Sequence, residues 1–418
     1  MSLILITFLF PFLGFILSLS QWKRPYAMNA FWLACCYMGA VMIYWPDGTI
    51  LGQGADAGRY YLEFIASADS NNTLVSILGS YMKTQDTLDL YKPLMEFFIA
   101  KLSTNGHFMF FMYAVVLGFF LSRNLWYILE NMPSHNEMYY ILWLFVFFFE
   151  IPIWKIGGAR FATAFHMFLY GIFPYVIEGK KKRLIWCALT VFVHFSFLYI
   201  SAFVLIYAYI PTKIKTRNLF LSIAFVFFII SLFITELNFG GVRDIVSSLS
   251  PESYNDRVEG YLNEDVLSRN QEANAARNWY VNMEGQIRKW IVNVFLLFIY
   301  FPIRKYLSKK TNVLNMLSFT LLMGGFANIS SLASGAGRFL HVHIALFVLV
   351  FLYTIPQLPN QLKIQSYFKY ASLLLLLPVI VGIRSGLEFY SITLFGNYIT
   401  VFFVENNTPI IEIIKHLL

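Results

Sequence analysis

The sequence predicts an all-α fold, a polytopic membrane helix bundle of about 10–12 spans that forms a single integral membrane domain over residues 1–418. Composition is the first reason, because 58% of the 418 residues are hydrophobic and only 13% are charged. Soluble globular proteins do not have this composition. Apolar runs of about 20 residues recur along the chain, which is the length that a helix needs to cross a bilayer. The third reason is that lysines and arginines cluster in short segments between these runs.

The predicted spans follow the apolar runs in chain order. The first run, 2–20, has the position of a signal peptide, but it lacks a basic leader and an obvious small-residue cleavage site. We therefore interpret it as a retained helix. The other spans are predicted near 26–45, 105–122, 138–154, 159–177, 219–236, 289–303, 312–331, 339–356 and 371–385.

The basic segments predict the orientation, since short positively charged loops face the cytoplasm. These segments are 23–24, 180–183 (KKKR), 213–217 (KIKTR), 304–310 (RKYLSKK) and 363–369. With them inside, the polar stretches 46–104 and 237–288 become external loops. Long polar loops of this kind, here containing several tyrosines and Trp279, are typical of binding elements.

One apolar stretch, 184–210, lies between two basic segments that are both predicted to be cytoplasmic. A single crossing would place one of them outside. Two half-length helices that enter the membrane and return would keep both inside, with His194-Phe195-Ser196 at the apex. We therefore predict a re-entrant hairpin, and the alternative is a plain helix with one exception to the charge rule.

This orientation places the isolated charges on the external face: Asp56, Arg59, Arg160, Arg338 and Arg384. Asp56, Arg59, Tyr60 and Glu63 are spaced so that a helix carries them on one side. They are either the polar side of a helix lying on the membrane, with a local Asp56–Arg59 pair, or a sugar-binding surface. In the second case Asp56 is a base or a hydrogen-bond acceptor, and the tyrosines stack on sugar rings.

Arg160 follows Gly157-Gly158, and Arg338 follows a stretch of small residues before an apolar run. Each is either an interfacial arginine whose head reaches water or a group that binds an anion. His194 is either a core histidine bonded to a backbone carbonyl or, beside Ser196, part of a site. His341 and His343 are two residues apart, so a helix directs them differently and they do not suggest a shared metal site.

Several classes of protein are disfavoured. The net charge of +8 comes with lysines in inter-helix loops, so it does not indicate nucleic acid. The three cysteines, Cys35, Cys36 and Cys187, lie in apolar runs and offer neither a disulfide framework nor metal spacing. The chain has no phosphate-binding glycine-rich loop, HExxH, CxxC or nucleophile elbow. We predict no metal site and no cofactor.

Four sequence features, taken in order, resemble the Wzy-type bacterial polysaccharide polymerases, in particular the EpsG branch. They are GADAGRYYLEF at 54–64, the arginine-led ARFATAFHMFLYGI from Ala159, the segment after EGKKKR that ends in VHFSFL, and GRFLHVHIALF from Gly337. The resemblance spans most of the chain. Phe161 stands where the family usually has glutamine or a similar residue.

The resemblance implies a glycosyltransferase of the bacterial cytoplasmic (inner) membrane that joins oligosaccharide repeat units carried on undecaprenyl pyrophosphate, on the periplasmic or outer face. Donor and acceptor would both be lipid-linked, and a chain-length regulator is a candidate partner. Arginine suits a departing pyrophosphate, because its planar fork matches phosphate oxygens. The predicted catalytic residues are Arg160 and Arg338, with Asp56 or His194 as the base. The predicted substrate-binding residues are Arg59, Tyr60, Tyr61, Ser196 and Arg384.

Two other functions remain open at this stage. A flippase or transporter of lipid-linked glycans would carry ionisable residues through the membrane midplane and an internal repeat, whereas the charges here gather on one face. A membrane acyltransferase that modifies surface glycans would rely on His341 or His194 and would need a polar site open to the cytoplasm.

Overall fold

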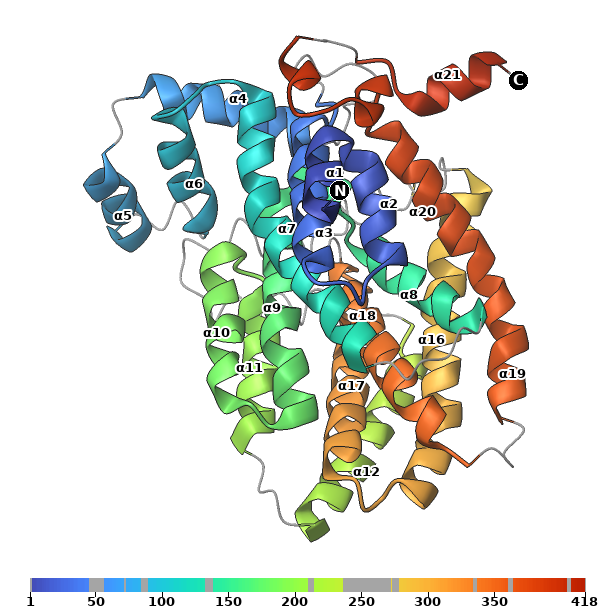
Figure 1. Cartoon of the computed structure of the whole chain (residues 1–418). Coiled ribbons are helices and arrows are strands. Elements are labelled where there is room, and N and C mark those ends of the chain that lie inside the picture. Colours follow the sequence, from blue (N-terminus) through green and yellow to red (C-terminus); the bar gives the residue numbers. More distant parts are fainter. Residues whose placement is uncertain are drawn as a thin grey trace.

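The computed structural model describes residues 2–44, 56–70, 73–83, 89–131, 138–209, 214–235, 272, 278–333, 337–359, 364–403 and 407–417. This part of the chain contains helices and no named strand; the one extended pairing is an isolated bridge between Met42 and Tyr390. The prediction of an all-α bundle is therefore confirmed (Figure 1).

The prediction of one span over 2–20 is wrong. Helix α1 (Leu3–Leu9) stops at Phe10, whose φ of −139° is not helical, and α2 (Pro11–Ser20) begins at the following proline. A residue before proline is pushed out of the helical region by the proline ring, which accounts for the break. The two helices fold back on each other so closely that a Cβ on Gly14 would lie 2.3 Å from the Thr7 hydroxyl.

The predicted external loop 46–104 is largely helical where the structure describes it. It holds α4 (Asp56–Asp69), α5 (Leu74–Lys83) and α6 (Tyr91–Ala100). These helices lie together at the upper left of Figure 1, beside the start of α7 (Gly106–Asn131). Helix α7 packs along α3 (Ala27–Ala40), where a Cβ on Gly39 would meet the Ala114 side chain at 2.3 Å.

The next two predicted spans correspond to α8 (Met138–Glu150) and α9 (Ala159–Glu178), joined by the 3₁₀ turn Ile153–Gly158. Pro152 lies between α8 and this turn, where its missing N–H prevents the helix from continuing. Helix α9 ends at Gly179, whose φ of 71° is left-handed and whose N–H reaches the carbonyls of Pro174 and Tyr175. Glycine adopts this capping conformation without the strain that a side chain would add.

Two short helices occupy 184–209, almost all of the predicted hairpin 184–210. Helix α10 (Leu184–Val193) ends at His194, which is extended, and α11 (Phe197–Tyr209) returns beside it. The predicted helical hairpin with its turn at His194-Phe195-Ser196 is thus present (Figure 1), and its depth in a membrane stays a prediction.

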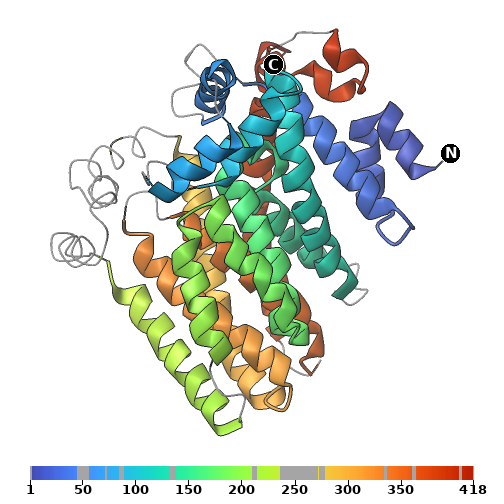
Figure 2. The ribbon, with the colours of Figure 1, turned by 90° about the vertical axis from the view of Figure 1, so that its left-hand side faces the viewer.

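The second half of the chain supplies the rest of the bundle. Its helices are α12 (Ile214–Phe233), α16 (Trp279–Tyr306), α17 (Thr311–Ser330), α18 (Arg338–Thr354), α19 (Ile364–Ala371), α20 (Leu376–Glu388) and the terminal α21 (Ile410–Leu417). Figure 2 shows α12 along the edge of the bundle, beside the orange α17. Almost all of the predicted external loop 237–288 lies outside the described residues, except for Glu272 and the start of α16.

Six helices of the described part are long and apolar enough to cross a membrane: Gly106–Asn131, Met138–Glu178 (which contains both α8 and α9), Trp279–Tyr306, Thr311–Ser330, Arg338–Gln357 and Ser366–Glu388. Pro11–Ser20 and Arg217–Phe233 are shorter apolar helices. This composition identifies a multi-pass membrane protein. Its core is aromatic, with Trp143, Phe165 and Phe168 among its fully buried side chains.

Candidate functional site

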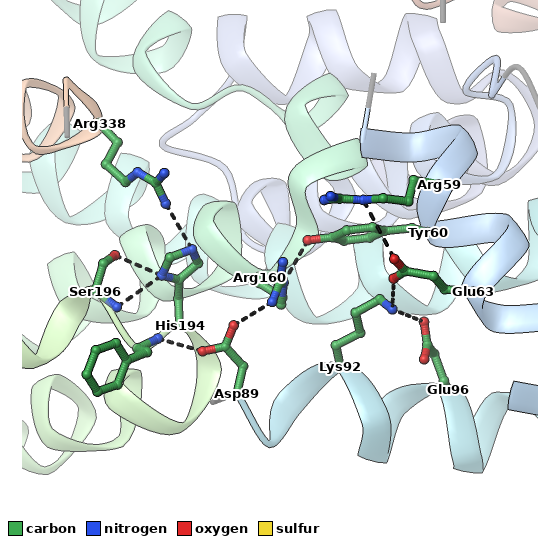
Figure 3. Close-up of polar contacts among 11 residues, drawn as sticks. Arg59, Tyr60, Glu63, Asp89, Lys92, Glu96, Arg160, His194, Ser196 and Arg338 are labelled. Atoms are coloured by element: carbon green, nitrogen blue, oxygen red, sulfur yellow. Dashed lines mark hydrogen bonds and ion pairs between the residues drawn. The ribbon is translucent and has the colours of Figure 1, made fainter. Parts of the chain in front are cut away.

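Asp89 organises the polar cluster at the head of α9. One oxygen of its carboxylate accepts a hydrogen bond from Arg160 Nη1 at 2.7 Å, and the other accepts one from the backbone N–H of Phe195 at 2.6 Å (Figure 3). The Asp89 side chain is only 5% exposed, so this acid is held almost entirely by protein groups. Asp89 therefore ties the tip of the α10–α11 hairpin to the arginine that leads α9.

Helix α4 brings a second partner to Arg160. Arg160 Nε donates a hydrogen bond to the Tyr60 hydroxyl of α4 at 2.8 Å, and the Arg160 guanidinium also lies 5.5 Å from the centre of the Tyr60 ring. This approach depends on Gly157, since a Cβ there would lie 3.0 Å from the Ala57 Cβ. Gly157 thus admits the close approach of helix α4, and Arg160 is a positioned group rather than a free interfacial one.

His194 joins the hairpin tip to Arg338. Its Nδ1 lies 2.8 Å from the Ser196 hydroxyl, and its Nε2 lies 3.2 Å from Arg338 Nη1. Arginine can only donate, so Nε2 accepts from Arg338, and Nδ1 also lies 3.2 Å from the backbone N–H of Ser196, which donates to it. The predicted grouping of Arg160, His194, Ser196 and Arg338 is therefore present as one connected cluster (Figure 3).

Charged residues of α4 and α6 extend this cluster. Lys92 pairs with Glu63 and, at 3.0 Å, with Glu96, and its ammonium lies 5.0 Å from the centre of the Tyr60 ring. Burial raises the pKa of the Glu96 carboxyl above its ordinary value, although the neighbouring Lys92 opposes this shift. Arg59, 56% exposed, lies 3.7 Å from Glu63 and close to the same tyrosine ring. Tyr60 thus lies among three cations.

Other predicted site residues do not join the cluster through described contacts. Tyr61 packs its ring against Tyr44, with centres 4.8 Å apart. Arg384 pairs with Glu388 on its own helix at 2.8 Å and lies over Tyr280 of α16. Asp56 begins α4, but its side chain lies outside the described part, so its predicted role as base stays a prediction.

The sequence interpretation missed Asp89, Lys92 and Glu96. A signal was available, because these charges cluster just before and within the otherwise apolar DLYKPLMEFFIA. Lys92 and Glu96 are four residues apart, so a helix places them on the same side. In the structure that side is buried at Glu96. Asp89 itself lies just before that helix, and only tertiary structure reveals that its partner is Arg160.

The arrangement suits the binding of an anionic ligand that also carries polar groups. The guanidinium groups of Arg160 and Arg338 lie on either side of the hairpin tip, and exposed Arg59 lies over the opposite end of the cluster (Figure 3). Arginine forks bind phosphate oxygens in pairs. Tyr60 is only 2% exposed, so its ring faces the neighbouring cations rather than a bound sugar.

The fold and the cluster together define a multi-pass membrane protein with an arginine-rich polar site at the ends of its helices. The sequence model of the EpsG family matches residues 49–341, a range that includes Arg160, His194 and Arg338. The chain therefore belongs to the EpsG family, which confirms the resemblance found in the sequence, and it is a glycosyltransferase-like polysaccharide polymerase in general terms. No curated protein sequence and no solved structure matches the chain.

Proposed function

We propose that this protein polymerises oligosaccharide repeat units, each carried on undecaprenyl pyrophosphate, into a surface polysaccharide such as O-antigen, capsule or exopolysaccharide. The observation that carries the proposal is the connection of Arg160 to Arg338 through Asp89 and the His194 turn. These arginines lead separate apolar helices, α9 and α18, that are far apart in the sequence. Membrane helices retain such groups for function, because ionisable side chains at these positions are costly.

The reaction explains the need for arginine. A hydroxyl oxygen of the acceptor sugar attacks the anomeric carbon of the donor, and the bond from that carbon to the phosphate oxygen breaks. The electron pair leaves with the lipid pyrophosphate, while the hydroxyl proton passes to a base. Permanently charged guanidinium groups stabilise the leaving anion most strongly in a partly dry groove. In this proposal they supply the positive charge that a divalent cation supplies elsewhere, so the reaction is metal-independent.

The proposal also assigns a face and a location. The site opens on the periplasmic or outer face of the bacterial cytoplasmic membrane, because the basic segments between the spans are predicted to be cytoplasmic. Helices α4 and α6 border the site and would form one wall of the glycan groove. The lipid tails of donor and acceptor would leave between helices into the bilayer, and a chain-length regulator is a candidate partner.

The test is the length distribution of surface polysaccharide in cells. Arg160→Ala and Arg338→Ala are expected to leave single repeat units in place of long chains, and Arg→Lys at either position is expected to fail as well because it removes the two-pronged contact. Arg304→Ala is the matched control, since Arg304 is exposed at the end of α16. Membrane levels of each variant are measured by immunoblot.

Normal chain-length ladders in both alanine variants would remove these arginines from the mechanism. A strain that lacks the protein separates the three candidate functions. Single units on the surface support a polymerase, loss of all surface glycan would indicate a flippase, and unchanged length would indicate an acyltransferase.

A further inference from the structure

A buried carboxylate lies at the end of α8. The Glu150 side chain is 0% exposed, and its two oxygens face different partners. Arg288 Nη1 of α16 donates to one at 3.0 Å, and His341 Nδ1 of α18 lies 2.7 Å from the other. Arg288 also pairs with Glu284 on its own helix at 3.2 Å. Three helices that meet in the bundle thus surround one acid.

Glu150 determines which nitrogen of His341 carries the proton. A carboxylate accepts hydrogen bonds, so Nδ1 must donate, and the neutral ring then has its lone pair on Nε2. In the described part of the chain no hydrogen bond is made to that nitrogen, and the side chain is 28% exposed. His341 can therefore accept a proton at Nε2.

His194, one of the two bases that the sequence offered beside Asp56, is differently placed. Its Nδ1 contacts Ser196 and its Nε2 contacts Arg338, so both ring nitrogens are engaged. Proton uptake at Nε2 would bring an imidazolium against a guanidinium, and like charges repel. His194 is thus better suited to hold Arg338 than to act as a base.

His341 borders the same space as the arginine cluster. It follows Arg338 by three residues on α18, so the two side chains lie on one side of that helix. The ring of Phe161 contacts both: its centre lies 6.4 Å from the His341 ring and 5.7 Å from the Arg338 guanidinium. Phe161 also lies 5.6 Å from the His194 ring. A substrate bound over Phe161 would meet Arg338 and His341 together.

We propose that His341 is the general base of the polymerisation reaction and that Glu150 is its positioning residue; this inference rests on the proposed function. As the acceptor oxygen bonds to the anomeric carbon, the hydroxyl proton moves to His341 Nε2 and the pyrophosphate departs with the electron pair of the broken bond. Glu150 fixes the ring and stabilises the imidazolium that forms. Arg288 holds Glu150 in place from the other side.

The test uses azide as a second nucleophile with the purified, full-length protein. Azide is already an anion, so its attack on the anomeric carbon releases lipid pyrophosphate and needs no base. His341→Gln is expected to lose about 100-fold or more of polymerisation, the usual contribution of a general base. It is expected to form glycosyl azide at the wild-type rate, because Arg160 and Arg338 are intact. Polymer is measured on gels and glycosyl azide by mass spectrometry.

Three further variants distinguish the loss of a general base from other effects of the substitution. His107→Gln, a half-buried histidine bonded to the Ala40 carbonyl, is expected to keep both reactions. Glu150→Gln keeps a similar shape and is expected to lower kcat for polymerisation about tenfold or more, with unchanged KM for the donor and unchanged azide product. His341→Asn is measured in parallel as a second substitution without a base.

Two outcomes overturn the assignment: polymerisation within a few-fold of wild type in His341→Gln and His341→Asn, or loss of glycosyl azide together with polymer. The second would place His341 on the donor side of the reaction. If wild-type protein leaves the lipid-linked donor intact under both conditions, the proposed function fails instead.

Discussion

At the scale of single residues, Asp89 joins the arginine that leads α9 to the tip of the α10–α11 hairpin. It accepts from Arg160 and from the backbone of Phe195, and it is 5% exposed while Arg160 is 27% exposed. Removing one partner of such a pair leaves a poorly hydrated charge, which typically costs about 3–5 kcal/mol. The pair therefore controls both the placement of Arg160 and the position of the hairpin tip.

We predict that Asp89→Ala lowers the thermal unfolding midpoint and abolishes long-chain polysaccharide, because Arg160 loses its counter-charge and Phe195 its acceptor. The double variant Asp89→Ala/Arg160→Ala is expected to unfold at a higher temperature than Asp89→Ala alone, since it leaves no uncompensated charge. Fluorescence-detected melting in detergent measures the midpoints. Additive losses in the double variant would show that the two side chains are not energetically coupled.

The cost of a charge beside an apolar run distinguishes the predicted residues from Asp89, but not from Glu150. Arg160, His194 and Arg338 stand out because each interrupts or borders an apolar run, where a charge or imidazole is costly. Glu150 gives the same signal at the end of MYYILWLFVFFFE, although it is not among the predicted site residues. Asp89 borders only the short apolar stretch of α6, outside the predicted spans, and its partners come from residues 160 and 195.

At the scale of elements, the α10–α11 hairpin places His194 at the site. Helix α10 has 10 residues and α11 has 13, so at about 1.5 Å per residue each is far shorter than the ~30 Å core of a bilayer. The charge rule predicted this hairpin from the basic segments on either side. It could not show how the hairpin is held against α9.

Gly171 of α9 provides that contact. A Cβ there would lie 2.7 Å from Cys187 Sγ and 2.9 Å from the Arg183 carbonyl oxygen, so it would push α10 away. We predict that Gly171→Val displaces the hairpin and its His194 turn, with loss of long-chain polysaccharide and a lower thermal midpoint. Gly79→Val on α5 is the matched control, because a Cβ on Gly79 would meet no described atom within 4 Å. Equal chain lengths in the two variants would contradict this role for the hairpin.

Two apolar runs show that the hydrophobic pattern alone does not locate the ends of helices. The run 2–20 is apolar throughout, so its length predicted one span, yet Pro11 divides it into α1 and α2. The run 138–177 was divided between 154 and 159, whereas α8 already ends at Glu150, before Pro152 and the 3₁₀ turn Ile153–Gly158. Breaks in apolar runs depend on one backbone position, and the pattern of hydrophobic residues alone does not reveal them.

At the scale of the whole molecule, the helix directions alternate about the site. Helix α9 begins beside it and α10 returns to it, so the basic turn Lys181–Arg183 lies at the far end of both. Helix α11 then leads away from His194, and α12 begins after it. If the site faces outward, residues 181–183 and the start of α12 must both face the cytoplasm, whereas α6 must lie outside.

Cysteine labelling in intact cells tests this arrangement. In a background with Cys35, Cys36 and Cys187 replaced by alanine, single cysteines are introduced at Lys182, Asn218 and Lys101, which are all exposed. We predict that a membrane-impermeant maleimide labels Lys101→Cys in intact cells, because this residue follows α6 on the side of the site. Lys182→Cys and Asn218→Cys are expected to react only after the membrane is opened, since both flank a hairpin that returns to its starting side. Labelling of Asn218→Cys from outside would mean that 184–210 crosses the membrane once, which would place the helices after it, and Arg338 with them, in the opposite orientation to Arg160.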